Sequence, residues 1–576
     1  MTDSVDASSF EHMEFKEQLA QNQDGFYETR LPWKVGHIPL PENKNQSTAR
    51  LYSVTRKLER LGKLKEYDDV MQDHIKMGVI EPVPAQPTGE IVHYVPHQPV
   101  IREQAESTKM RIVYDCSSKP DAITPSLNDC LETGPSLQPL LFDILLCNRF
   151  RRYCITGDMV KAFLQIIVQE CDRDAQRILW YDDLLNRNVL EYRFTRVIFG
   201  ATPSPYILGA TLQKHLDRYE GVYPETVQVL RDDTYVDDIQ GGGDFEKDVI
   251  QFKEEATTVL AGASFQLHKW HSNVPLADTS SNEEEEQTYA KTVAGNPKTT
   301  EIKILGIPWD LLNDCMTISF EPCFKIEPPI TKQKMVAAIN SVFDVLGWSS
   351  PVMIIVKLLF SNVCLLKLHW DEDLPPDIVQ LWWCWIGKLR RQRFITVPRS
   401  IVSQGGSEFE IHGFSDASKK AVCAAIYTVE YQGTEPVNQS LLVTKSRVAP
   451  KDTSVPRLEL IATMTLPKLQ NNVLKALKAQ PIRSVHHWVD SVTILYWLAN
   501  KGTWSAFVRN QVKKIKELEE VDWRYVPTND NPSDLGTRRA APDKLGDLWY
   551  KGPDWLQKHD QWPEQPEIKE TTDSKQ

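Results

Sequence analysis

The sequence predicts a multidomain protein of the α/β (α+β) class. Its 576 residues exceed what one ordinary hydrophobic core can serve. Segments with strand-like alternation and segments with helical spacing follow one another along most of the chain. A Gly-Gly-Ser break at 405–407 precedes a new strand-rich segment, so we expect a domain boundary there.

The composition is typical of a globular protein, with 41% apolar and 25% charged residues. The polar, acidic N-terminus lacks the order of a signal peptide. The most apolar stretch, 351–368, contains Lys357, Ser361 and Asn362, so we expect a buried helix and no membrane partner. The ten cysteines form no C-x-x-C pair and no Cys/His cluster, which favours a reducing, intracellular setting.

The formal net charge of −12 argues against a nucleic-acid partner, but the basic residues are grouped. One basic run lies within 50–65, and another, within 388–399, follows a tryptophan-rich segment at 382–385. Acidic residues concentrate at 280–287 and after 563. A basic run beside aromatic side chains suits a phosphate backbone, and a solvated helix face is an equally good interpretation of either run alone.

The first half is expected to alternate helices and strands after a flexible segment at 1–25. Apolar residues at helical spacing predict helix within 48–80, and prolines at 81–90 end it. The remaining expected elements are strands at 93–101, 110–116 and 190–199, helices at 137–152, 203–219 and 245–262, a strand ending near Asp158, a hairpin at 233–240, and an acidic surface loop at 272–300.

The second half is expected to change character near residue 400. A helical, tryptophan-rich region follows the segment 304–310. Beyond the break at 405–407, strand-like sequence at 408–431 precedes helical patterns at 457–478 and 491–500.

Two neighbouring carboxylates stand out in DDTYVDDIQGGG, residues 232–243. Asp237 and Asp238 lie at the expected hairpin tip, and Asp158 lies at the end of an apolar strand. If the two strands are neighbours in one sheet, three carboxylates surround one small volume, which suits hard divalent cations such as Mg²⁺. A turn that simply favours Asp is the ordinary interpretation of a bare pair.

A second acidic set lies beyond residue 408. Asp416 in GFSDAS, Glu459 in PRLELIA, Asp490 in HHWVDS and Asp534 in NPSDLGTR are expected on a strand, a helix, a strand end and a late loop. Each acid alone reads as a solvated surface residue. His486 and His487, which precede Asp490, are expected to be packing residues.

The order of these segments resembles a reverse transcriptase over about residues 26–556. YVDD (235–238), GDMVKAFLQI and FGATPSPYIL carry the likeness. The resemblance implies a right-hand polymerase with fingers, palm and thumb, in which two metal ions promote attack by a 3′-hydroxyl. It assigns metal ligands at Asp158, Asp237 and Asp238, and contacts with the triphosphate at Arg111 and Lys109. Around the nucleotide, it assigns a steric gate at Phe163, a template-side glycine at Gly200 and a proton donor to the leaving group at Lys269. It also assigns a primer grip to LGIPWD, with Gly306 and Trp309.

The D-E-D-D order of the second set resembles ribonuclease H. The resemblance implies that Asp416, Glu459, Asp490 and Asp534 hold two Mg²⁺ ions, with Mn²⁺ as a possible substitute, for cleavage of the RNA strand of a hybrid. Backbone contacts are assigned to Lys445, Arg447 and Arg538.

Several longer sequence segments resemble the Pao/BEL group of long-terminal-repeat retrotransposons, notably TKSRVAPKDTSVPRLEL and LWYKGPDWL. The final acidic motif, NPSDLGTR, departs from the group only by small-for-small changes. No D-T-G or D-S-G triplet occurs, which counts against a peptidase, and no integrase pattern is present. The implied division is a flexible N-terminus (1–25), an N-terminal extension (26–90), fingers and palm (91–310), thumb and connection (311–405), a ribonuclease H-like domain (406–545) and a tail (546–576).

The expected function is RNA- and DNA-directed DNA synthesis with hybrid-specific ribonuclease H activity. The implied partners are an RNA template, a DNA primer, an RNA/DNA hybrid and deoxynucleoside triphosphates, with other Pol or Gag products as further candidates. A cytoplasmic location is expected, with a virus-like particle as a candidate compartment, and nuclear access is left open. The alternatives are an inactive or domesticated copy that binds nucleic acid without catalysis and, less favoured, a retrotransposon peptidase.

Overall fold

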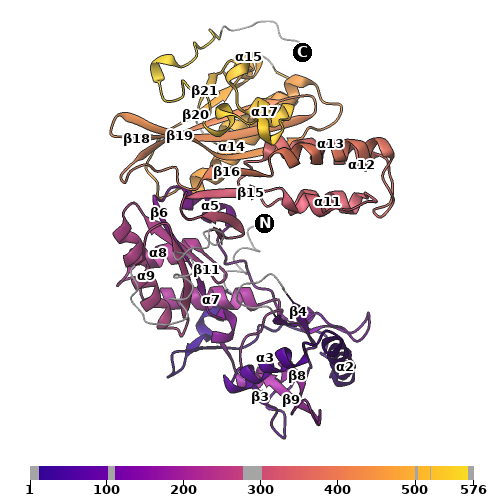
Figure 1. Cartoon of the computed structure of the whole chain (residues 1–576). Coiled ribbons are helices and arrows are strands. Elements are labelled where there is room, and N and C mark those ends of the chain that lie inside the picture. Colours follow the sequence, from indigo (N-terminus) through magenta and orange to yellow (C-terminus); the bar gives the residue numbers. More distant parts are fainter. Residues whose placement is uncertain (1–11, 102–109, 277–300, 500–503, 519–520, 569–576) are drawn as a thin grey trace. The chain divides into compact units, whose positions relative to one another are not determined.

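The computed structural model describes residues 12–101, 110–276, 301–499, 504–518 and 521–568 (Figure 1). The chain separates into two compact units, the first formed by residues up to 139, 157–239 and 252–270, and the second by 140–156, 240–251 and residues from 271. The multidomain α/β class is confirmed. Among the described residues, no helix has the length and apolar character needed to cross a membrane.

The first unit contains two three-stranded sheets, of order β1-β2-β7 and β3-β9-β8, and the pair β4-β5. Its strands are β1 (Ala20–Gln21), β2 (Tyr27–Thr29), β3 (Ile80–Pro82), β4 (His97–Ile101), β5 (Met110–Tyr114), β7 (Ile167–Val168), β8 (Arg177–Tyr181) and β9 (Val189–Phe194). Its helices are α2 (Lys44–Arg60), α3 (Leu64–Lys76), α4 (Leu127–Cys130), α6 (Glu170–Arg173), α7 (Ser204–Leu216) and α8 (Pro224–Asp233).

A four-stranded sheet of order β10-β11-β6-β12 carries the expected hairpin. β10 (Thr234–Tyr235) and β11 (Asp238–Gly243) pair in antiparallel fashion, with Tyr235 opposite Asp238. The other members are β6 (Tyr153–Met159) and β12 (Leu267–Ser272), and α9 (Glu246–Ala261) follows β11. The hairpin, the helix that ends before Gly262 and the strand that contains Asp158 are confirmed.

Two expectations for the N-terminal part need correction. The helix predicted within 48–80 is two helices, because Gly62 takes a positive φ of 64° and the N–H of Lys63 returns to the carbonyl of Leu58 at 2.9 Å. The segment 1–25 is not flexible throughout. Residues 12–18 are helical, β1 pairs with β2, and Phe15 and Leu19 are buried.

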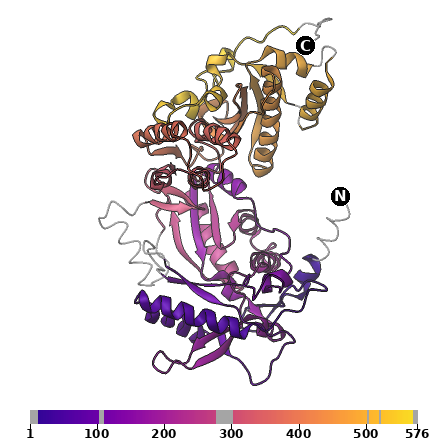
Figure 2. The ribbon, with the colours of Figure 1, turned by 90° about the vertical axis from the view of Figure 1, so that its right-hand side faces the viewer.

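The second unit is built around a five-stranded sheet of order β19-β18-β17-β20-β21. Its strands are β17 (Glu408–Ala417), β18 (Ala421–Gln432), β19 (Glu435–Val448), β20 (Ile482–Val489) and β21 (Asp522–Tyr525). The pairs β17-β18 and β18-β19 are antiparallel, whereas β20 runs parallel to β17 and to β21. The long helix α14 (Val455–Ala476) runs along the sheet and contacts β17 and β18 (Figure 2).

A helical segment packs against this sheet. α12 (Ser350–Leu365) contacts β19, and its first turn is tied to that strand by the 2.8 Å hydrogen bond from the Thr444 hydroxyl to the Ser350 hydroxyl. Trp348 donates its indole N–H to the carbonyl of Leu442. The other helices of the unit are α5 (Leu141–Arg149), α11 (Lys332–Ser341), α13 (Pro376–Arg391), α15 (Val492–Ala499), α16 (Ala506–Leu518), α17 (Ser533–Arg538) and α18 (Asp547–Tyr550).

A second sheet of this unit has the order β13-β14-β15-β16. It is formed by β13 (Glu301–Ile304), β14 (Ile307–Asp310), β15 (Cys315–Ser319) and β16 (Phe394–Pro398). The boundary predicted at residue 310 therefore falls between two paired strands, because Asp310 lies opposite Cys315. The described part of the C-terminal tail also packs on this unit, where Trp549 is buried and donates to the carbonyl of Trp348.

Candidate functional site

Strand pairing brings the three acids of the first set together. The N–H of Met159 donates to the carbonyl of Asp237 at 2.8 Å, so the end of β6 lies against the hairpin turn. On the other side, the N–H of Val160 donates to the carbonyl of Gln266 just before β12. Asp158 thus stands between the hairpin tip and Lys269, whose ammonium lies 3.9 Å from the Asp158 carboxylate.

The carboxylates of this first set strongly influence one another. Burial, followed by the charge of Asp158 and a hydrogen bond to it, raises the pKa of Asp238 to about 7. Burial also raises the pKa of Asp237, with a further contribution from Asp158 and an opposing one from Arg111. Three acids that share this space disfavour full ionisation unless a cation lies between them.

The turn at the hairpin tip is conformationally strained. Val236 has a φ of 59°, a region that β-branched residues rarely adopt. Its N–H donates to the side-chain oxygen of Gln138 at 2.8 Å, and this bond helps to hold the turn. Such strain concentrates at functional sites, where the surrounding structure maintains it.

The predicted nucleotide-side residues lie on neighbouring segments of the first unit. Arg111 is exposed on β5, and Phe163 is buried, with its ring 4.7 Å from the ring of Phe199. Gly200 has a φ of 104°, and a Cβ at this position would lie 2.3 Å from the carbonyl oxygen of Tyr114. Only glycine therefore fits there. Lys109 lies outside the described residues.

The second unit brings the other four acids together at one end of its sheet. Asp416 lies near the end of β17, Glu459 in α14, Asp490 directly after β20 and Asp534 in α17. The charge of Asp416 acts on each of the other three.

Burial dominates the electrostatics of this second set. Burial and then the charge of Asp416 raise the pKa values of Asp490 and Asp534 to about 6. Burial also raises the pKa values of Asp416 and Glu459. As in the first set, burial and mutual repulsion disfavour full ionisation of these acids.

Neighbouring side chains hold three of these acids in place. The Thr537 hydroxyl donates to Asp416, and the Ser491 hydroxyl donates to Glu459 at 2.6 Å. The Arg538 guanidinium lies 2.6 Å from Asp534. Ser491 and Thr537 were not predicted, although each stands within four residues of a predicted acid, where a hydroxyl is a natural carboxylate partner.

The chemistry of both sets fits hard cations. Carboxylate oxygens suit Mg²⁺, which keeps several water or phosphate ligands and takes one or two carboxylates from the protein. In the part of the chain that the structure describes, no three acidic, histidine or cysteine side chains stand close enough to hold a metal ion by themselves. A cation bound at either set would complete its coordination with water or substrate phosphates.

The predicted nucleic-acid contacts differ in exposure. Lys445 and Arg447 are exposed on β19, and Arg538 is exposed but paired with Asp534. Gly306 forms the tight turn between β13 and β14, with a φ of 92°. Trp309 is fully buried beneath the Arg399 guanidinium and donates to Asp314 at 2.8 Å, so its side chain supports the sheet and offers no surface to a primer.

The histidines before Asp490 lie within the sheet, as expected for packing residues. His487 is fully buried, with its ring 4.6 Å from that of Trp523, and burial lowers its pKa to about 3. His486 stacks on His412 at 5.2 Å between ring centroids.

The comparisons with known proteins agree with this architecture. Residues 331–491 match the family model described as the Pao retrotransposon-like RNaseH-like domain. The match begins at the N-cap of α11, includes the helical segment before the five-stranded sheet, and ends one residue after Asp490. No curated protein sequence matches the chain.

Two solved structures share the fold of most of the chain. The foamy viral protease-reverse transcriptase dRH in complex with double-stranded DNA has a TM-score of 0.53 at 12% identity, over 90% of this chain and 81% of that one. The foamy viral protease-reverse transcriptase in complex with double-stranded DNA has a TM-score of 0.51 at 14% identity, over 90% and 92%. The chain therefore has the fold of a reverse transcriptase with a ribonuclease H-like domain, and its residues 331–491 are similar to the Pao retrotransposon family.

Proposed function

We propose that the chain synthesises DNA on RNA and DNA templates and cleaves the RNA strand of the resulting hybrid. The observation that carries the proposal is the presence of two separate carboxylate sets, one in each unit. The first is gathered by strand pairing, and the second by strand pairing together with two helices, α14 and α17, that contact β17. Asp158, Asp237 and Asp238 would serve DNA synthesis. Asp416, Glu459, Asp490 and Asp534 would serve hybrid cleavage.

At the first set, the proposed role of the acids is to hold Mg²⁺, which when bound would activate a 3′-hydroxyl and stabilise the leaving pyrophosphate. Arg111 is exposed, and its charge partly opposes the rise that burial causes in the pKa of Asp237, so it can pair with the triphosphate beside that acid. Phe163 would exclude a ribose 2′-hydroxyl and so select deoxynucleotides. Lys269, next to Asp158, would donate a proton to the leaving group.

At the second set, Asp416 has the central place because its charge influences the other three acids. Thr537 and Ser491 would orient Asp416 and Glu459. Lys445 and Arg447 offer exposed cations for the backbone of the hybrid. Mn²⁺ could replace Mg²⁺ at either set, because both ions accept oxygen ligands.

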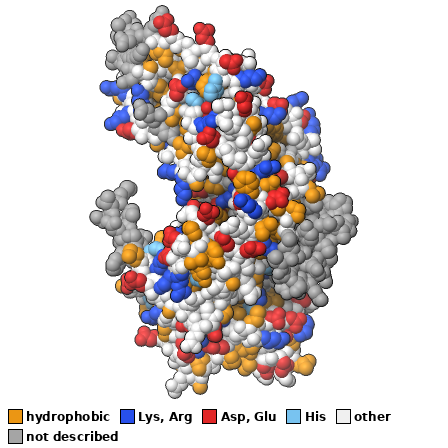
Figure 3. All heavy atoms as spheres, turned by 90° about the vertical axis from the view of Figure 1, so that its left-hand side faces the viewer, with side chains coloured by type: hydrophobic (Ala, Val, Ile, Leu, Met, Phe, Trp, Pro, Cys, Tyr) orange, Lys and Arg blue, Asp and Glu red, His pale blue; other side chains and the backbone are white. Residues whose placement is uncertain are grey.

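The surface is compatible with a nucleic-acid partner despite the net charge of −12. On the face drawn in Figure 3, Lys and Arg side chains gather in small groups between acidic ones. Such groups can neutralise phosphates locally. We propose an RNA template, a DNA primer, an RNA/DNA hybrid and deoxynucleoside triphosphates as ligands, and a cytoplasmic setting with other Pol or Gag products.

The decisive experiment measures both activities of the full chain in two variants. Asp237→Asn should abolish DNA synthesis on a primed RNA template and preserve hybrid cleavage, whereas Asp416→Asn should do the reverse. Asp24→Asn and Glu327→Gln, at exposed carboxylates in each unit, serve as charge-matched controls. Binding of primed template without either activity would instead support the alternative, a copy that retains nucleic-acid binding alone.

A further inference from the structure

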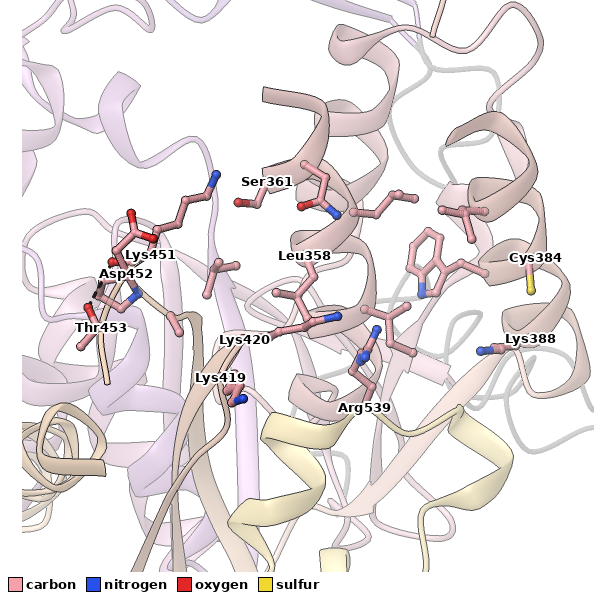
Figure 4. A pocket seen from close by; sticks show the side chains of 18 residues that line it. Leu358, Ser361, Cys384, Lys388, Lys419, Lys420, Lys451, Asp452, Thr453 and Arg539 are labelled. Carbon is pink, nitrogen blue, oxygen red and sulfur yellow. Dashed lines mark hydrogen bonds between the residues drawn. The ribbon is translucent and has the colours of Figure 1, made fainter. Parts of the chain in front are cut away.

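A pocket of about 400 Å³ lies in the second unit between the helices α12 and α13 and the loops around β18 and β19 (Figure 4). Ile355 and Leu358 of α12, with Leu381 and Trp385 of α13, give it an apolar wall. Its volume is within the range of small-molecule sites. The order of the acids along the sequence gave no indication of it, and it belongs to neither carboxylate set.

Five cations from four different segments line this pocket. Lys388 comes from α13, Lys419 and Lys420 from the turn between β17 and β18, Lys451 from the loop after β19, and Arg539 from the residue after α17. In Figure 4, Lys420 and Arg539 lie between α12 and the strand ends, with Lys388 on the far side. Asp452 is the acidic residue among the lining side chains.

Within the described residues, no carboxylate forms an ion pair with these cations. None of the five side chains forms an ion pair with another residue in the described ranges. Like charges gathered around one space repel each other, and this repulsion opposes the folded arrangement until an anion binds. A phosphate group, which accepts several charge-assisted hydrogen bonds, is the anion that Lys and Arg commonly bind.

A buried donor provides an independent indication of a ligand. Trp385 is only 2% exposed, it lines the pocket, and its indole N–H has no acceptor among the described residues. Buried N–H groups almost always have a partner, so this unpaired donor in the pocket wall is a candidate for a hydrogen bond to a ligand. A carbonyl or ring nitrogen of a nucleobase would supply it.

The walls of the pocket are fixed before any ligand binds. The N–H of Ala449 donates to the carbonyl of Lys420 at 2.8 Å, which joins the two loops that carry lysines. The N–H of Ala540 donates to the carbonyl of Pro351 at 3.2 Å, which places Arg539 beside the start of α12. A preformed pocket loses little conformational entropy on binding.

We propose that this pocket binds one nucleotide unit of a nucleic-acid strand, with its base on the apolar wall and its phosphate among the cations. Inorganic phosphate would leave the apolar wall in water, and an apolar ligand would leave the cations unpaired. The proposal rests on the proposed function for the nature of its partner. Lys419 and Lys420 follow Asp416 on the same segment, and Arg539 follows α17, which carries Asp534. The strand bound here is therefore one that also meets the ribonuclease H acids.

Two native cysteines allow a direct test in the full chain. Cys384 lines the pocket and is exposed, whereas Cys364, near the end of α12, is exposed but does not line it. The rates at which N-ethylmaleimide alkylates the two thiols would be measured by mass spectrometry, with and without a saturating single-stranded oligothymidylate. By mass action, ligand at several times its Kd should slow alkylation of Cys384 about fivefold and leave Cys364 unchanged. An unchanged Cys384 rate, or equal slowing of both thiols, would overturn the proposal.

Three further arms separate the parts of the proposal. An abasic oligomer of the same length should protect Cys384 less than oligothymidylate does, and equal protection would exclude the base contact. Thymidine monophosphate should protect Cys384 only weakly. If it protects Cys384 and oligothymidylate does not, the pocket binds a free nucleotide. The triple variant K388A/K420A/R539A should lose protection and lower the salt slope of binding by about 0.7, the contribution of the single phosphate that the pocket holds.

Controls separate this proposal from the proposed function. K468A/K475A, at exposed lysines of α14 that do not line the pocket, should retain protection. Asp416→Asn should also retain it, because this acid does not line the pocket. Protection without either enzymatic activity would sustain the pocket and refute the proposed function, whereas activity without protection would do the opposite.

Discussion

The two acidic sets differ in how their carboxylates are held. At the hairpin tip of the first unit, Asp238 interacts with another carboxylate, that of Asp158, and the turn between the strands is strained. In the second unit, Thr537, Ser491 and Arg538 each bind one acid. We therefore expect the first set to depend more on an external cation than the second, whose charges are partly satisfied by the protein itself.

The largest expected effect tests this dependence at Asp238. Asp238→Asn should lower the rate of DNA synthesis about a thousandfold or more, because the charge that organises the site is lost. In metal-free buffer, the same variant should melt about 2–4 °C higher than the parent near pH 8. Thermal unfolding monitored by circular dichroism would measure the shift.

The sign of this stability effect follows from the raised pKa of Asp238, about 7. A carboxyl that binds its proton more tightly in the folded state than in the unfolded state, where the pKa is about 4, loses stability as the pH rises between these values. The advantage of Asp238→Asn should thus disappear near pH 4. Asp534→Asn, which also removes the partner of Arg538, should give a smaller gain, and equal gains would contradict the contrast between the two sets.

The next effect concerns the hydroxyl that orients Asp416. Thr537→Val keeps the shape of this buried side chain but removes the donor, so hybrid cleavage should fall about 10- to 100-fold, the equivalent of a hydrogen bond to a charged group. The loss should appear in kcat, and Thr537→Ser should restore it. Unchanged DNA synthesis in the same preparation would show that folding is intact, whereas equal loss of both activities would assign Thr537 a structural role only.

A smaller effect is expected at the strained turn. Val236→Asn should stabilise the protein by about 1 kcal/mol, because Asn tolerates the left-handed conformation far better than a β-branched residue. DNA synthesis should fall severalfold if the strain helps to position the adjacent acids. Urea unfolding and a primer-extension assay would give the two values. Val236→Thr, which keeps the branched Cβ, should gain no stability.

The parts of the site that depend on local sequence could be predicted. The alternation before Asp237 and the glycines after Asp238 define a hairpin whose tip must carry both acids. Likewise, Asp416 and Asp490 lie at the ends of apolar strands, and parallel pairing of β17 with β20 brings those ends together. In both cases, neighbours along the chain determine where the side chain points.

The parts that depend on long-range packing could not be predicted. Trp309 lies in a segment whose position suggested a primer grip, yet its burial depends on Arg399, ninety residues away in sequence. The cationic pocket forms only because α12, which also contacts α13, packs against a sheet that begins after both helices. No periodic pattern in either segment shows which surfaces will meet.

The smallest effect separates binding from orientation in the second unit. Lys445 lies opposite Ala424, and Arg447 lies opposite Val422, so both cations project from one face of the β18-β19 pair. Ser446, between them, projects from the other face, where its hydroxyl donates to the carbonyl of Gly536 in α17. The two cations are thus on the opposite face from the helix that carries Asp534. Lys445→Ala combined with Arg447→Ala should weaken hybrid binding severalfold, lower the salt slope by about 1.8 and leave kcat unchanged. Arg538→Ala, which frees Asp534, should instead lower kcat, and a fall in kcat in the double variant would place its cations at the reaction centre after all.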